Sequence, residues 1–99
     1  MELSLSSLVE NKPVKIEVDG NPVCVAKVGD KVFAISDTCS HSDASLSEGD
    51  IRNGKIECWL HGAEFDLATG EAVTGPAFEP VATYGVTIEG DSVSITGKN

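Results

Sequence analysis

Basic residues, histidines and long apolar runs are all scarce in this sequence of 99 residues. Seven Lys and Arg stand against sixteen Asp and Glu, which gives a formal net charge of -9. Binding to nucleic acid requires many cationic side chains, so we expect no nucleic-acid partner. No apolar run is long enough for a membrane span or a secretory signal. We therefore expect a cytoplasmic protein with no membrane partner.

Cysteine is also sparse, and its three copies cannot all pair with one another. The cysteines are Cys24, Cys39 and Cys58, so at least one of them has no disulfide partner within the chain. A reducing compartment disfavours disulfides in any case. Cys24 lies on an alternating strand pattern, where a free cysteine is typically a small buried hydrophobe. The remaining two thiols are better suited to binding metal than to forming a bridge.

Helical periodicity is missing, and alternation with a period of two replaces it. Residues 14–18, 23–28 and 31–36 read as short strands separated by turn residues, which predicts a meander. Residues 86–95 read as a hairpin with Gly90-Asp91 at the turn, in which Val86 and Ile88 face Val93 and Ile95. The sequence therefore predicts one all-β domain, a small antiparallel sandwich or barrel.

The middle of the chain has a different character. Between residues 36 and 80, Ser/Asp/Gly-rich loops are interrupted by two short strand-like pieces, 54–59 and 63–73, the second with a Thr69-Gly70 turn. Residues 37–79 hold nine acids against Arg52 and Lys55, so this segment carries -7 of the net charge. The excess serves either solubility or electrostatic steering toward a basic partner.

Both histidines fall in this middle segment, and each has a cysteine nearby. Cys39 and His41 form the first pair, Cys58 and His61 form the second, and sixteen residues separate the pairs. A cysteine nucleophile with a histidine base would leave the second pair idle. A structural zinc site fits the number of ligands, although such sites usually group two cysteines and then two histidines. The alternating order suits a cluster of two irons, in which each loop gives one ligand to each metal, as in a Rieske 2Fe-2S centre.

The run "CSH", followed after sixteen residues by "CWLHGAEFDLATGEAVTGPA", resembles the Rieske-type ferredoxins of bacterial aromatic-ring-hydroxylating dioxygenase systems. The resemblance implies an antiparallel β-sandwich base, residues 1–36 and 80–99, with a cluster-binding subdomain of two ligand loops in residues 37–79. A third loop with Gly75-Pro76-Ala77 would shield the cluster. The implied ligands of the 2Fe-2S cluster are Cys39, His41, Cys58 and His61.

The resemblance also implies a function. A ferredoxin of this type is a monomeric one-electron carrier that passes electrons from a flavoprotein reductase, driven by NAD(P)H, to a terminal oxygenase acting on aromatic compounds. Related oxygenases hold a second, mononuclear iron with histidines, but both histidines here are already used. We therefore expect no enzymatic activity. A structural zinc-binding or regulatory module of the same fold remains the alternative.

Several residues near the ligand pairs define the expected subtype. High-potential Rieske proteins place hydroxyl side chains where this sequence has Ala63 and Phe65, so we expect a potential near the low end of the family, about -150 mV. Phe65, Pro76 and Phe78 are expected to form a dry shell around the cluster. Trp59 either packs under the neighbouring loop or contacts a partner protein.

Overall fold

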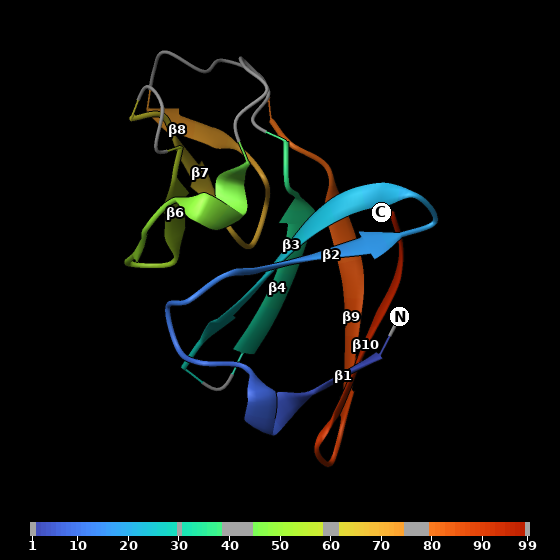
Figure 1. The fold of residues 1–99 in the computed structure, drawn as a ribbon. Coiled ribbons are helices and arrows are strands. Elements are labelled where there is room, and N and C mark those ends of the chain that lie inside the picture. The colour runs from blue at the N-terminus through green and yellow to red at the C-terminus, as the bar shows by residue number, and fades with distance from the viewer. Residues whose placement is uncertain (1, 30, 39–44, 59–61, 75–79, 99) are drawn as a thin grey trace.

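The computed structural model describes residues 2–29, 31–38, 45–58, 62–74 and 80–98. In these ranges, ten strands form two antiparallel sheets, which confirms the predicted all-β class (Figure 1). The base sheet has the order β1(Glu2–Ser4), β10(Ser92–Lys98), β9(Thr83–Glu89), β4(Lys31–Ser36), β3(Asn21–Val28), β2(Val14–Val18). The small sheet has the order β5(Ile51–Arg52), β6(Lys55–Glu57), β7(Glu64–Asp66), β8(Ala72–Thr74). Two 3-10 helices are present, η1(Leu5–Ser7) and η2(Leu46–Glu48).

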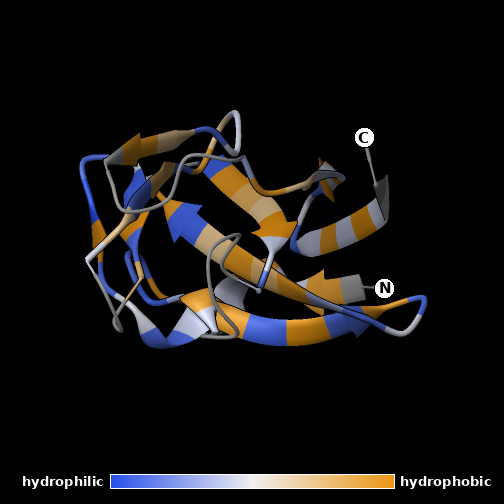
Figure 2. Cartoon of the chain, turned by 90° about the horizontal axis from the view of Figure 1, so that it is seen from above, coloured by the Kyte–Doolittle hydropathy of each residue, from blue (hydrophilic) through white to orange (hydrophobic). Residues whose placement is uncertain are grey.

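The base sheet follows the predicted alternation. Strands β2, β3 and β4 are neighbours in that order, as a meander requires. In the β9–β10 hairpin, Ile88 pairs with Val93 and Val86 pairs with Ile95, as the sequence predicts. Figure 2 shows hydrophobic and hydrophilic residues alternating along the longer strands. Period-two patterning therefore places one face of each strand against a core.

The small sheet is built from strands of only two or three residues. Asn53 and Gly54, both with positive φ, close the turn between β5 and β6, a backbone shape that suits an Asn-Gly hairpin. A row of paired apolar residues runs across this sheet, namely Ile51, Ile56, Phe65 and Ala72. The pairing puts these side chains on one face, and that face turns toward the base sheet.

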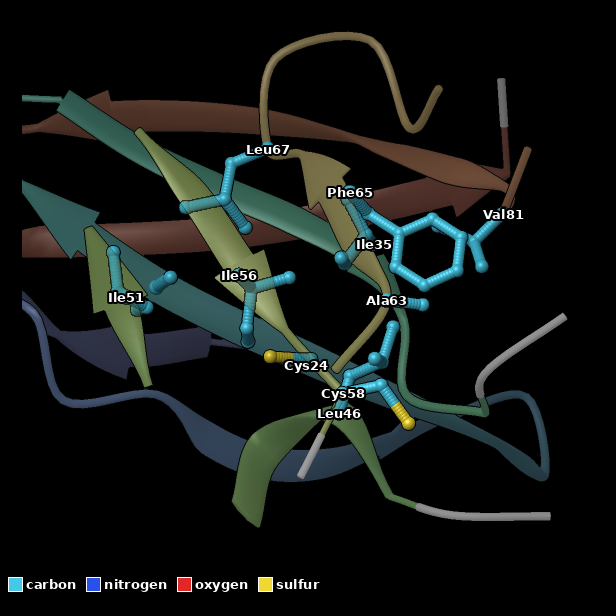
Figure 3. Close-up of a cluster of buried hydrophobic side chains, with 11 residues drawn as sticks. Cys24, Ile35, Leu46, Ile51, Ile56, Cys58, Ala63, Phe65, Leu67 and Val81 are labelled. Carbon is cyan, nitrogen blue, oxygen red and sulfur yellow. The ribbon is translucent and has the colours of Figure 1, made fainter. Parts of the chain in front are cut away.

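Two hydrophobic cores result, and β3 contributes to both. Val23 and Val25 belong to the core of the base sheet, whereas Cys24 and Ala26 belong to the core shared by the two sheets. Both faces of β3 are thus buried. Figure 3 shows the shared core, in which the small sheet supplies Ile51, Ile56 and Phe65, the turn after β7 supplies Leu67, and the base sheet supplies Cys24 and Ile35. The prediction that Cys24 is buried is confirmed.

Four short elements were not predicted from sequence patterns. Strands β1 and β5 and helices η1 and η2 have three residues or fewer, which is too short for a periodic signal. Among the described residues, no helix is long and apolar enough to cross a membrane.

Candidate metal centre

The two ends of the first predicted ligand loop lie side by side. Thr38 and Ser45 form an antiparallel bridge, and the Leu46 N–H donates a hydrogen bond of 2.6 Å to the Asp37 carbonyl. The described residues on the two sides of segment 39–44 are therefore paired with each other. Two of the predicted ligands, Cys39 and His41, lie outside the described residues.

The second predicted ligand loop is closed in a similar way. The Cys58 N–H donates to the Ala63 carbonyl at 2.6 Å, and the Gly62 N–H donates to the Cys58 carbonyl at 2.9 Å. Gly62 has a φ of +78°, a conformation that glycine adopts without steric cost. Between these anchors lie Trp59 and His61, which are outside the described residues, so neither proposed role of Trp59 is tested.

The third predicted loop is anchored through Gly70. The Gly70 N–H donates to the Asp66 carbonyl at 2.7 Å, and the Val81 N–H donates to the Gly70 carbonyl at 2.8 Å. A Cβ atom on Gly70 would collide with the Val81 carbonyl oxygen, so only glycine permits this contact. Residues 75–79, with Pro76 and Phe78, lie outside the described part of the chain.

All three anchor points meet in the shared core. Leu46 from the end of the first loop, Cys58 and Ala63 from the second, and Val81 from the third are buried in one cluster. Figure 3 shows Leu46 and Cys58 gathered on one side of it. Three loops that are distant in sequence therefore start from one apolar platform.

Cys58 is the one predicted ligand that the structure describes. It follows strand β6 directly, and its side chain is fully buried. A thiolate in such apolar surroundings needs a compensating partner, and a metal ion provides one. The donor chemistry at this position therefore fits an iron-sulfur cluster. Among the described residues alone, no group of three or more His, Cys, Asp or Glu could hold a metal, and the other three predicted ligands lie outside them.

Cys24 provides the contrast within the same core. It sits in the middle of β3, away from any loop, and burial raises the pKa of its thiol strongly, with a further contribution from the charge of Asp37. A thiol with a raised pKa stays protonated and is a poor ligand. The structure thus agrees with excluding Cys24 from the metal centre.

The residues at the predicted hydroxyl positions are both buried. Ala63 and Phe65 have no exposed surface and pack in the shared core with Cys58. Neither side chain can donate a hydrogen bond to a sulfur atom. The burial of Phe65 agrees with its predicted place in an apolar wall, and the low reduction potential stays a prediction.

Both cations of the acidic middle segment lie on the β5–β6 hairpin. Arg52 forms an ion pair with Glu57 at 3.0 Å, and Arg52 and Lys55 line a hollow together with Asn53, Glu57, Gly62 and Glu64. The ion pair is exposed, so it contributes little to stability. It neutralises one carboxylate beside the second loop.

Sequence reasoning missed the part played by Asp37. It is the one buried polar or charged side chain in the described ranges, with 1% of its surface exposed. From the sequence alone, Asp37 is one of the nine acidic residues in 37–79 and has no feature that sets its charge apart. A lone carboxylate directly after a buried strand and two positions before a predicted ligand was the signal that could have identified it.

Comparison with known proteins identifies a family. The description "Rieske [2Fe-2S] domain" matches residues 2–85. A relative from Rhodococcus jostii, the ferredoxin component of biphenyl 2,3-dioxygenase, is 40% identical over 92 residues, which are 93% of this chain and 86% of the relative.

Solved structures agree with this match. The ferredoxin of carbazole 1,9a-dioxygenase from Nocardioides aromaticivorans superposes with a TM-score of 0.93 at 36% identity, covering 95% of this chain and 92% of that one. A ferredoxin in complex with the oxygenase of carbazole 1,9a-dioxygenase gives a TM-score of 0.89 at 32% identity, with 94% and 96% covered. Dicamba monooxygenase gives 0.83 at 28% identity, but the match covers 94% of this chain and only 32% of the monooxygenase.

Proposed function

We propose, on the premise that this chain belongs to the Rieske [2Fe-2S] domain family, that Cys39, His41, Cys58 and His61 hold its 2Fe-2S cluster. The chain is an electron carrier, the ferredoxin component of an aromatic dioxygenase system, and not itself a catalytic subunit. The ligand assignment rests on one observation. The described residues next to the predicted loops are hydrogen-bonded to each other and packed in one buried cluster that includes Cys58.

When bound, the cluster would supply reversible one-electron chemistry. In the proposed arrangement Cys39 and Cys58 would hold one iron, and His41 and His61 would hold the other. Two ferric ions, two sulfides and two thiolates sum to zero charge, so neutral imidazoles favour reduction relative to an all-cysteine centre. With no hydroxyl at Ala63 or Phe65, we propose a potential near the low end of the family, about -150 mV. A redox titration measures it.

The residues of the platform exclude water from the side of the cluster that faces the protein. Leu46, Ala63, Phe65 and Val81 are buried and apolar, so they offer no mobile polar group that would have to reorient when the charge of the cluster changes. A centre on a rigid support can exchange electrons without rearranging the fold. In the proposed division into a base, residues 1–36 and 80–99, and a cluster-binding part, residues 37–79, most of this support belongs to the same segment as the loops, and Val81 belongs to the base.

The share of each relative that the match covers favours a carrier over an oxygenase. The match covers 86% of the ferredoxin component of biphenyl 2,3-dioxygenase, but only 32% of dicamba monooxygenase. Both histidines are assigned to the cluster, which leaves none for a mononuclear iron.

The proposed partners are a flavoprotein reductase that supplies electrons and a terminal oxygenase that receives them. The relative solved in complex with its oxygenase supports the second of these. We propose that the carrier is a monomer in the cytoplasm and meets each partner briefly through a small interface. The strongly acidic composition gives no support to a nucleic-acid partner.

Metal analysis tests the ligand assignment. We expect about two irons and two acid-labile sulfides per chain, and loss of both from Cys58→Ser and His61→Ala proteins that still fold. Transfer of electrons from a reductase to an oxygenase should require the loaded carrier. One zinc and no sulfide in the wild-type protein would replace this proposal by a structural zinc module.

A further inference from the structure

Asp37 connects three segments of the chain at the base of the first ligand loop. Its N–H donates to the Pro22 carbonyl at 3.1 Å, and its own carbonyl accepts from the Leu46 N–H at 2.6 Å. Its carboxylate oxygen Oδ1 accepts from the Ser47 N–H at 2.8 Å. One residue thus joins the start of β3, the end of β4 and the beginning of η2.

The bond to Ser47 fixes the point where the chain returns from the loop. Helix η2 begins at Leu46, and the residue before it, Ser45, makes no side-chain capping bond. The Asp37 carboxylate supplies a tertiary substitute, because it satisfies an N–H in the first turn. Asp37 therefore connects the described residues on the two sides of segment 39–44.

Burying a carboxylate is an expensive way to stabilise a fold. Transfer of a carboxylate from water into a protein core costs free energy, which hydrogen bonds such as the one from the Ser47 N–H offset only in part. An apolar residue at this position would bury surface without that cost. The presence of a fully buried carboxylate, 1% exposed, two residues before a proposed ligand therefore points to positioning rather than stability.

The position of η2 also matters to the second loop. Leu46, the first residue of the helix, is buried in the same cluster as Cys58. A shift of η2 would move the end of the first loop and disturb the packing around Cys58 at the same time. Asp37 therefore lies at the point where the geometry of one loop is coupled to that of the other.

We propose that the Asp37 carboxylate is a positioning residue for the cluster, acting through Ser47 to set where the first ligand loop closes. This inference rests on the proposed function, because it takes Cys39 and His41 as ligands. It predicts that the hydrogen-bond acceptor at Oδ1 controls how tightly the cluster is held and how its ligands are oriented.

Three variants separate this role from general stability. Asp37→Ala removes the acceptor, Asp37→Asn keeps an acceptor of the same shape, and Asp91→Ala is the matched control. Asp91 Oδ1 also accepts a backbone N–H at 2.8 Å, that of Ser6, at the turn between β9 and β10. The readouts are the rate of cluster loss to an iron chelator, the electron paramagnetic resonance spectrum of the reduced protein, and the thermal unfolding midpoint.

We expect Asp37→Ala to lose its cluster on the order of tenfold faster than the wild type, the lower end of the usual range for residues behind metal ligands, with an altered spectrum. Asp37→Asn should restore the wild-type rate and spectrum, and Asp91→Ala should leave both unchanged. A wild-type rate in Asp37→Ala overturns the proposal, as does an Asp91→Ala protein that loses its cluster equally fast. An Asp37→Asn protein as fast as Asp37→Ala overturns the acceptor role.

If Asp37→Ala does not fold, amide hydrogen exchange decides. Slow exchange of the Leu46 and Ser47 amides in the loaded wild type and in Asp37→Asn supports the proposal, and fast exchange overturns it. A wild-type protein without iron and sulfide rejects the proposed function, and this inference with it. A wild-type protein that carries the cluster, with Asp37→Ala unaffected, rejects the role of Asp37 alone.

Discussion

The base sheet and the small sheet are both antiparallel, but they are stable for different reasons. Strands β2, β3, β4, β9 and β10 have five to eight residues and enclose a core of their own. The small sheet has strands of two or three residues, shorter than the usual length for a stable strand. Its apolar face packs only on the shared core.

The small sheet therefore depends on the base, whereas the base has a core that does not need the small sheet. The proposed ligand loops belong to the dependent half. This difference predicts that damage to the shared core removes the cluster before the base unfolds. Damage to the base core should instead remove fold and cluster together.

Truncating Phe65 should have the largest effect of the substitutions that test this dependence. Phe65 is fully buried at the centre of the small sheet, paired with Ile56 and Ala72. We expect Phe65→Ala to cost about 3–5 kcal/mol of unfolding free energy, and to release the cluster at a lower temperature than the base unfolds. Visible absorption follows the cluster, and far-ultraviolet circular dichroism follows the strands.

Ile95 in the base core gives the matched comparison for Phe65. It is buried among the residues of the base core and is not a member of the shared core. Ile95→Ala should cost about 2–5 kcal/mol, with the cluster and strand signals lost at one temperature. Separate transitions in Ile95→Ala, or a single one in Phe65→Ala, would contradict the proposed dependence.

Two glycines, one beside the small sheet and one in the base sheet, allow the two regions to be compared through smaller changes in stability. Gly49 lies directly against β6, where a Cβ atom would collide with the backbone carbonyl of Glu57, and Gly97 in β10 has open space around it. Neither has a positive φ, so backbone strain does not enter. We expect Gly49→Ala to cost about 1–3 kcal/mol through overpacking.

Gly97→Ala should be neutral or stabilising by about 0.4–1 kcal/mol, because alanine lowers the entropy of the unfolded chain. Urea unfolding measures both variants, and chelator challenge measures the cluster. Cluster loss should be faster only in Gly49→Ala. Equal effects of the two substitutions would show that close packing against β6 is not needed.

Sequence patterns predicted the base sheet better than the small sheet, and the reason is physical. The alternation in β2 and in the β9–β10 hairpin follows from burial on one face, so even the pairing of Ile88 with Val93 was correct. Strand β5 has two residues, Ile51 and Arg52, which cannot show a period. Its place depends on contacts with β6 that only the folded chain supplies.

Some features of the candidate site could also be predicted from the sequence, and others could not. Residue types, spacing and the family resemblance were sufficient to propose four ligands, because a Rieske centre requires cysteine and histidine in a particular order; that assignment stays a prediction. They could not find Asp37, since its role depends on Ser47, ten positions away, and on burial. The close approach of Gly70 to Val81 is likewise a property of the fold.

The two regions also differ in charge, and salt should reveal this. Residues 37–79 carry -7 of the net charge of -9, so the part of the chain with the proposed cluster is the more acidic. If this charge steers the carrier to basic partners, transfer rates at low carrier concentration should fall by roughly tenfold or more between low and high salt. Stopped-flow kinetics with a reductase would show it.

A charge reversal outside the middle segment provides the control for steering. Glu17 lies on β2 and is exposed. Glu17→Lys should leave the slope of rate against salt nearly unchanged, whereas Glu48→Lys, in η2 beside the first loop, should reduce it. Rates that do not depend on ionic strength would remove steering and leave solubility as the role of the acidic residues.

The smallest expected effect concerns Asp91, at the β9–β10 turn of the base. Its carboxylate accepts a hydrogen bond of 2.6 Å from the Ser4 hydroxyl and one of 2.8 Å from the Ser6 N–H. The bond from Ser4, and then that from Ser6, lowers the pKa of Asp91. A group with a lowered folded pKa stabilises the fold above its unfolded pKa, about 3.9, and this contribution disappears as the pH falls through the folded pKa.

We therefore expect Asp91→Asn to be slightly less stable than the wild type at pH 7, and the difference to shrink below about pH 4. Because Asp91 is fully exposed, the effect should be far smaller than that of Phe65→Ala. Urea unfolding at a series of pH values measures it. Since Asp91 fastens only β1 and η1 to the base, cluster absorption at pH 7 should not change. A cluster weakened by Asp91→Asn would mean that the two regions are coupled through the whole base sheet, against the independence that its separate core implies.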